Sequence, residues 1–160
     1  MQNTESEKLK PIVWVGPSLK DLRKFPNEVQ REIGYALYQA QVGKKHHNTK
    51  PLKGFDGVME ILSDYDKDTY RGVYAYKLGD DIYMLHTFQK KSKKGIKTPK
   101  EDIEIVKQRL KRAKELKAQL EKDESSYRSA IKSLRPQVSK KSTDQSKFIA
   151  ELQEVFVKYP

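Results

Sequence analysis

Arg71 stands in the middle of an apolar and aromatic stretch, TYRGVYAY, and its position suggests chemistry. An arginine in such a strand must reach water, a carboxylate or a bound anion, because an unpaired buried charge is costly. Its planar guanidinium can hold two oxygens of a phosphate at once. Two interpretations stay open: a functional arginine that binds an anion, and a structural arginine paired with a carboxylate such as Glu60.

A run of lysines provides the second group of candidates. Five lysines crowd the end of an expected strand and the loop after it: Lys90, Lys91, Lys93, Lys94 and Lys97. Most charge runs are solvated surface, and for any single lysine that is the default interpretation. The cluster as a whole is harder to explain in this way, because residues 90–114 hold eleven cations against three acidic residues.

The charge of the chain points to a polyanionic partner. The net charge is +11 over 160 residues, which favours nucleic acid or an anionic membrane surface. Cations interleaved with aromatic rings suit RNA, where lysines pair with phosphates and unstacked bases lie on rings. Lys53, in a basic loop at residues 44–54, can flank the same sheet edge, and Tyr74 lies on a nearby strand.

Several classes of chemistry find no support in the sequence. Cysteine is absent, which excludes disulfides and thiolate catalysis and is consistent with a cytoplasmic protein. There is no Gly-rich phosphate loop, zinc motif, paired-carboxylate motif or nucleophilic triad, so neither a metal nor a cofactor is expected. His86 alternates with apolar residues and is interpreted as structural. An enzyme of this composition must rely on cations, tyrosines and the substrate's own nucleophile.

The order of the expected elements predicts an α+β fold. A short strand at residues 12–15 precedes a helical hairpin, whose first helix Ser18 is expected to cap. The second helix carries an apolar stripe at helical spacing: Val29, Ile33, Leu37 and Ala40. Three strands, at residues 58–62, 70–78 and 82–89, then predict an antiparallel meander.

The second half of the chain is expected to be helical, with one interruption. Thr98 is predicted to cap a helix that packs on the sheet, and this helix completes a domain spanning residues 11–121. Residues 122–160 are interpreted as a polar linker followed by a helical extension, with a further helix at 125–134 as an alternative to open linker. Asp144 is expected to cap the last helix, whose apolar stripe is Phe148, Leu152, Val155 and Tyr159. No apolar run is long enough to span a membrane.

Three stretches also resemble a known family. FPNEVQREIGYALYQAQVG, KPLKGF and the segment from TYRGVYAYKLGDD to LHTFQKKSKKGIKTPKEDI are similar to the phage-derived Gp49-like, HigB-type toxins of the RelE/ParE superfamily. The resemblance runs from about Ile12 to Leu116, and the last stretch is its most specific part. It implies a RelE-like toxin fold, with a small antiparallel sheet, an N-terminal helical hairpin and a C-terminal helix.

The resemblance implies the toxin of a type II toxin–antitoxin system, a ribosome-dependent mRNA endoribonuclease that inhibits translation. Its partners would be mRNA, the ribosome and a cognate helix-turn-helix antitoxin, and its oligomeric state stays open. In RelE-type enzymes cations on the sheet surround the scissile phosphate. Arg71 matches the arginine of the second meander strand, and Lys90 or Lys91 matches the cation that ends the third.

The chemistry implied for these residues is metal-independent. The RNA 2′-hydroxyl attacks the adjacent phosphate while cations neutralise the developing charge. A lysine or Tyr74 can move protons provided that its pKa is lowered. The RNA-binding candidates are Lys53, Lys93, Lys94 and Lys97. Two other readings stay open: a ParE-like toxin that acts on DNA gyrase without cleaving RNA, and an inactive nucleic-acid-binding protein.

Overall fold

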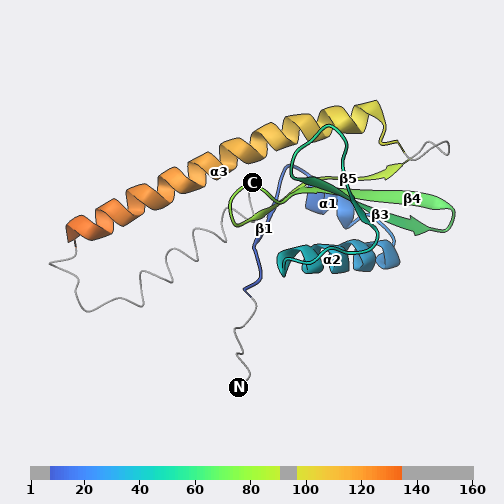
Figure 1. Ribbon diagram of the computed structural model, residues 1–160, viewed down its shortest axis with the longest axis horizontal. Helices are drawn as coiled ribbons and strands as arrows, with labels where there is room; N and C mark the ends of the chain where they lie inside the picture. Colours follow the sequence, from blue (N-terminus) through green and yellow to red (C-terminus); the bar gives the residue numbers. More distant parts are fainter. Residues whose placement is uncertain (1–7, 91–96, 135–160) are drawn as a thin grey trace, which may run out of the picture.

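The computed structural model describes residues 8–90 and 97–134, and it shows a sheet between two helical layers. Helix α3 (Lys100–Leu134) covers one face, and helices α1 (Ser18–Leu22) and α2 (Asn27–Gln41) lie on the other (Figure 1). Three of the predicted site lysines, Lys91, Lys93 and Lys94, lie outside the described residues, as does the helix expected at residues 144–160.

The sheet has five strands in the order β1-β5-β4-β3-β2. Their bounds are β1 (Ile12–Trp14), β2 (Thr49–Pro51), β3 (Val58–Tyr65), β4 (Asp68–Ala75) and β5 (Ile82–Lys90). The α+β class is confirmed, and the small antiparallel sheet that the resemblance implied holds for β2 to β5 but not for β1. β1 runs parallel to β5, and Ile12 is opposite Ile82. Both helices and three strands lie between β1 and β5 in the chain, and this long connection allows the two strands to run in the same direction.

The predicted antiparallel meander forms from β3, β4 and β5. Its first turn is tight, since Tyr65 is directly opposite Asp68. The two residues between them, Asp66 and Lys67, have φ of 48° and 68°, the left-handed backbone that a two-residue hairpin turn needs. The register of β4 on β5 shifts between Val73 and Tyr74, which marks a bulge on this pair.

Two apolar clusters fix the layers. The predicted stripe of α2 is buried, and Ile33 packs with Ile61 and Met84 on one face of the sheet. On the other face Val106, Ala113 and Leu116 of α3 join a separate cluster with Val73, Tyr83 and Leu85. Residues of one strand therefore alternate between the α2 face and the α3 face, which decides which side chains can meet.

The N-terminal helical hairpin is not confirmed. Helix α1 has five residues and contacts β5, whereas α2 contacts β3. The prediction that Ser18 caps α1 is wrong, because Pro17 occupies that position and makes no side-chain cap. The Ser18 hydroxyl instead donates to the carbonyl of Met84, and the Thr87 hydroxyl donates to the Ser18 carbonyl at 2.7 Å. These two bonds tie α1 to β5.

Helix α3 is longer than the sequence indicated. It runs without a break for 35 residues and crosses the expected domain boundary at residue 121. Ion pairs one turn apart continue along its second half, from Lys117 to Glu121 and from Glu124 to Arg128. The second half extends beyond the sheet (Figure 1). None of the helices in the described ranges combines the length and apolar character of a membrane span.

Candidate functional site

A buried ion pair lies on the α3 face of the sheet. Glu60 of β3 and Arg71 of β4 are diagonal neighbours, because Leu62 is the residue directly opposite Arg71. Arg71 Nη1 donates to Glu60 Oε1 at 2.6 Å, and the two side chains are 3% and 0% exposed. Arg71 therefore forms the ion pair with Glu60 that the structural interpretation predicted. Removing either partner would leave a buried charge uncompensated.

Three further groups surround the same carboxylate. Lys50 of β2 is directly opposite Glu60, and its Nζ lies 3.9 Å from Glu60 Oε1. Thr98, predicted to cap α3, donates its hydroxyl to Glu60 Oε2 at 2.6 Å. Lys90 ends β5, and both Arg71 and Glu60 act on its charge. We call Lys50, Glu60, Arg71, Lys90 and Thr98 the Glu60 cluster.

The cluster has an excess of positive charge and an unusual lysine. Three cations share one carboxylate. Lys90 is 7% exposed, and this burial lowers its pKa from the ordinary value of 10.5. The nearby Arg71 charge lowers that pKa further, while Glu60 opposes the shift. A lysine with a lowered pKa can give up its proton more readily than a solvated lysine.

Arg71 also has hydrogen-bonding capacity to spare. Among the described residues its Nε is a buried donor with no hydrogen-bond partner. Buried polar groups are nearly always paired, so an unpaired one in a native fold calls for an explanation. Nη1 is engaged by Glu60, and the remaining Nε edge has the shape for a two-pronged contact with an anion, but it is buried, so an anion reaches it only if the groups that cover it move.

The cations among the predicted site residues divide into three groups. Arg71 and Lys90 are brought together in the Glu60 cluster. Lys53 and Lys97 are exposed, and Lys97 precedes Thr98 at the edge of that cluster. Lys91, Lys93 and Lys94 fall in residues 91–96, outside the description, but this segment begins after Lys90 and ends before Lys97. Both of its ends are therefore close to the cluster in sequence.

Tyr74 does not join the site. It is 4% exposed and packs in the cluster formed with α2, on the opposite face of the sheet from Arg71. Burial raises its pKa to about 12. A proton-moving tyrosine would need a lowered pKa and a place beside the phosphate, and Tyr74 has neither.

From the sequence, Lys50 was placed only in the basic loop that flanks the sheet edge and Thr98 only as a helix cap, while Glu60 was considered only as a structural partner. A signal for Glu60 was present, since it interrupts the apolar strand VMEIL just as Arg71 interrupts its neighbour. Opposite charges placed inside two adjacent strands indicate a buried pair. Across the described part of the chain, no group of three or more histidine or acidic side chains is arranged to hold a metal ion.

The comparison with known families decides the lineage. Residues 20–111 match a family model described as phage derived protein Gp49-like (DUF891), and these residues are more than half of the chain. The chain belongs to the Gp49-like family. This phage-derived family is related to toxin–antitoxin systems. No curated protein and no solved structure matches the chain significantly.

The Gp49-like region contains the whole Glu60 cluster, from Lys50 to Thr98. It also contains a second polar group, in which His86 of β5 lies between two residues of α3. Arg109 Nη1 contacts His86 Nδ1 at 2.9 Å, and His86 Nε2 contacts Asp102 Oδ1 at 2.8 Å. Because arginine only donates, Nδ1 must be the acceptor and Nε2 carries the hydrogen that Asp102 receives. This arrangement holds a neutral imidazole and fits the predicted structural role of His86.

His86 is expected to make stability depend on pH. Burial lowers its pKa below 6.5, the nearby Arg109 charge adds to the lowering, and Asp102 opposes it. The unfolded chain then binds more protons than the folded one as pH falls below 6.5. We expect the free energy of unfolding to fall in this range, and to fall less in His86→Gln, whose amide can accept from Arg109 and donate to Asp102.

Urea melts at a series of pH values measure this difference. His46, whose pKa burial also lowers, contributes to both proteins and so cancels in the comparison. An equal loss of stability on acidification in the wild type and in His86→Gln would contradict the assignment of a neutral His86.

Proposed function

We propose that this Gp49-like protein is the toxin of a type II toxin–antitoxin pair and cleaves mRNA on the ribosome. The observation that carries the proposal is the Glu60 cluster, with three cations around one carboxylate and the Nε of Arg71 unpaired among the described residues. A phosphate can complete that hydrogen bonding and match the excess charge. A cognate antitoxin is consistent with the toxin-like family.

The proposed reaction uses the RNA's own nucleophile. The 2′-hydroxyl oxygen forms a bond to the adjacent phosphorus and loses its proton to water, and the bond from phosphorus to the 5′-oxygen breaks. Arg71 holds the phosphate through its Nε edge and stabilises the charge that develops on its oxygens. Glu60 orients that guanidinium through Nη1. The products are a 2′,3′-cyclic phosphate and a 5′-hydroxyl.

Lys90 is the proposed proton donor. Its burial and its place beside Arg71 lower its pKa, which suits an ammonium that must release a proton to the leaving 5′-oxygen. Before that transfer, the same ammonium adds a positive charge beside the phosphate. Lys90 therefore satisfies the requirement, stated above from the sequence, that a lysine which moves protons at this site has a lowered pKa.

Lys93, Lys94 and Lys97, which follow Lys90 closely in the sequence, are proposed to bind the RNA backbone. Replacing Lys93, Lys94 and Lys97 by alanine is expected to reduce the slope of log affinity against log salt by about 2, because each lost phosphate contact on a single strand removes about 0.7. The matched control is alanine at Lys107, Lys111 and Lys114, which are exposed on α3. Fluorescence anisotropy with a labelled single-stranded RNA measures both slopes. Equal slopes for the two triple variants would exclude specific phosphate contacts by Lys93, Lys94 and Lys97.

A second candidate function deserves a direct comparison because Arg71 is 3% exposed and already paired with Glu60. A purely structural Arg71 would be compatible with a ParE-like toxin, which acts on DNA gyrase without cutting RNA. Brief induction in a bacterial host, followed by mapping of transcript ends and a test for DNA damage, separates the two. We expect codon-phased cuts in translated mRNA. DNA damage without such cuts would favour the gyrase toxin.

A further inference from the structure

Two tyrosine rings are exposed on the outer side of α2. Tyr35 and Tyr38 are 56% and 48% exposed, whereas Ile33 and Leu37 of the same helix are buried toward the sheet. The two tyrosine rings lie nearly parallel, with centroids 6.5 Å apart and an interplanar angle of 25°. A single exposed tyrosine is ordinary, but two that face each other on one surface provide a site where another flat ring can pack.

The loop between α2 and β2 extends this surface with two histidine rings. The His46 ring meets Tyr35 edge-on, with centroids 5.7 Å apart, and its centroid lies 4.2 Å from that of His47. His46 is buried, and its Nδ1 accepts a hydrogen bond from the backbone N–H of Asn48, which fixes the ring. His47 is exposed. We call Tyr35, Tyr38, His46 and His47 the aromatic row.

Exposed cations flank the aromatic row. Lys44 and Lys45 lie in the same loop, and Arg31 lies on α2 one turn before Tyr35. Glu32, the acidic residue beside Arg31, is half-buried and accepts hydrogen bonds from Asn48 and from the Ser63 hydroxyl at 3.1 Å. Aromatic rings with cations beside them are the composition that binds single-stranded nucleic acid, because bases stack on the rings and phosphates pair with the cations.

A pocket connects the aromatic row to the Glu60 cluster. Its volume is about 450 Å³, and both His47 and Lys50 line it. It lies at β2, an edge strand of the sheet. Thr49 is opposite Ile61, which packs with α2, whereas Lys50 is opposite Glu60. A strand bound on the aromatic row can therefore pass round this edge to Lys50, whose Nζ lies 3.9 Å from Glu60 Oε1.

The pocket suits a base better than a phosphate. Glu32 and Asp64 also line it, together with Asn48. Carboxylates repel a phosphate, but they accept hydrogen bonds from the N–H groups on the edge of a base, and an amide can both donate and accept there. The phosphates of a bound strand are then left to Lys50 and to the exposed cations of the loop.

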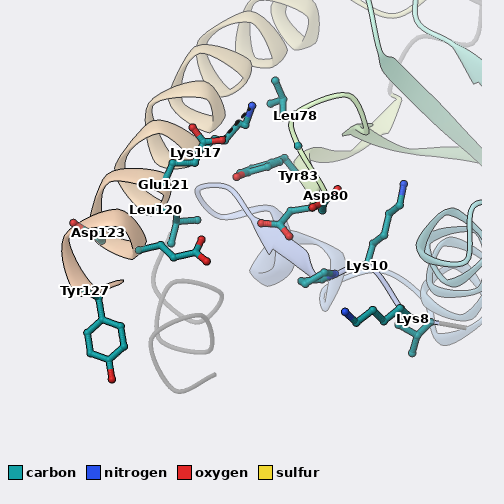
Figure 2. Close-up of a pocket in the computed structure, with 15 residues that line it drawn as sticks. Lys8, Lys10, Leu78, Asp80, Tyr83, Lys117, Leu120, Glu121, Asp123 and Tyr127 are labelled. Atoms are coloured by element: carbon teal, nitrogen blue, oxygen red, sulfur yellow. Dashed lines mark ion pairs between the residues drawn. The ribbon is translucent and has the colours of Figure 1, made fainter. Parts of the chain in front are cut away.

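The larger groove beside the second half of α3 has a different character. It has a volume of about 650 Å³, and Figure 2 shows Lys117, Glu121 and Asp123 of α3 on one side and Asp80 on the other. Five acidic and three basic side chains line it, although the chain as a whole carries a net charge of +11. Charge therefore favours the α2 side over this groove as the place for a polyanion.

We propose that the aromatic row and its flanking cations bind single-stranded RNA, with unpaired bases stacked on Tyr35, Tyr38 and His47. The strand continues through the pocket at β2 to the Glu60 cluster, and the row holds the nucleotides on one side of the phosphate that is cut. This path rests on the proposed function, because it makes the strand a substrate. Contacts away from the reacting phosphate help to hold it in place for the reaction.

Tyr35→Ala tests the stacking, with Tyr76→Ala as the matched control. Tyr76 is also exposed, at 40%, and follows β4. Fluorescence anisotropy at raised salt, where non-specific phosphate contacts weaken, measures affinity for a short unstructured RNA and for an RNA duplex of the same length. We expect Tyr35→Ala to bind the single strand at least about fivefold more weakly than the wild type, and Tyr76→Ala to bind it equally well. Tyr35→Phe keeps the ring and should keep the affinity.

The duplex separates stacking from charge, because paired bases stay stacked on each other and are not free to pack on the row. Duplex affinity should therefore be the same in all four proteins. An equal loss for duplex and single strand would overturn the stacking role. Equal single-strand affinity of Tyr35→Ala and Tyr76→Ala would overturn the RNA surface and assign the exposed tyrosines to a protein contact. Thermal melts check that each variant is folded.

Mapping of transcript ends keeps this proposal apart from the proposed function. If the wild type makes no cuts but Tyr35→Ala loses single-strand affinity as expected, the RNA surface stands and the nuclease is rejected. If the wild type cuts mRNA but Tyr35→Ala binds the single strand as well as the wild type does, the nuclease stands and the aromatic row is rejected as its RNA surface.

Discussion

The double variant Glu60→Gln with Arg71→Gln is expected to fold but to lose RNA cleavage by about 10²–10³-fold, because the transition state loses a positioned cationic donor. Arg71→Gln alone is a poor test of catalysis. It leaves Glu60 buried without its closest cation, and breaking such a pair costs about 3–5 kcal/mol. In the double variant the two amides can bond each other while Thr98 still has an acceptor, so most of that stability should return.

Thermal melts and a cleavage assay on the double variant, on Arg71→Gln and on Glu60→Gln separate structure from catalysis. Glu60→Gln alone keeps the arginine and removes the paired charge. A double variant that is as stable as the wild type and cleaves RNA at the wild-type rate would reduce Arg71 to a structural residue. It would also leave the proposed nuclease without its principal phosphate contact.

Lys90→Arg is expected to slow cleavage by about 10²-fold or more while the positive charge is retained. Arginine does not release its proton at accessible pH, so the variant keeps charge stabilisation and loses proton donation. In the wild type the protonated lysine is the active form. Activity should therefore be present below the pKa of Lys90 and be lost as pH rises through it, at a pH below the ordinary 10.5 because burial lowers that pKa.

The pH profile of the variant supplies the decisive comparison. Lys90→Arg should lack the alkaline loss of activity, whereas the control Lys100→Arg, at an exposed position at the start of α3, should keep both the rate and the loss. If Lys90→Arg retains the same alkaline fall as the wild type, another group donates the proton.

Local patterns predicted the elements with strong signals. The aromatic and β-branched residues of β4 and β5, and the apolar stripe of α2, gave the meander and the second helix near their observed positions. β2 was missed because Thr49–Pro51 has a charge and a proline, and such a strand is recognisable only through its partner β3. The parallel pairing of β1 with β5 is also non-local, and no pattern within either segment encodes it.

The end of α3 was misjudged for a different reason. The polar, serine-rich composition after Lys122 is typical of a linker, but residues 100–134 contain neither glycine nor proline. Ion pairs such as that between Glu124 and Arg128 favour a helix with little apolar burial. Composition alone therefore placed the end of this helix too early.

The membership of the Glu60 cluster was predicted only in part. The charges of Arg71 and Lys90 identified two members of the cluster, but their mutual distance and burial depend on how three strands register. Tyr74 could have been excluded from sequence, because three residues along a strand reverse the side-chain direction and place it opposite to Arg71. The lowered pKa of Lys90 could not be predicted, since it arises from burial that only the fold determines.

The chemistry of the cut ends tests the central claim most directly. Purified protein is added to ribosomes that are translating a defined mRNA, and the new ends are analysed by selective ligation and mass spectrometry. Attack by the 2′-hydroxyl at the Glu60 cluster predicts a 5′-hydroxyl on one fragment and a 2′,3′-cyclic phosphate on the other. The Glu60→Gln, Arg71→Gln double variant should form these ends much more slowly than the wild type. A 5′-phosphate with a 3′-hydroxyl, or intact mRNA under conditions in which the protein is toxic, would contradict the account.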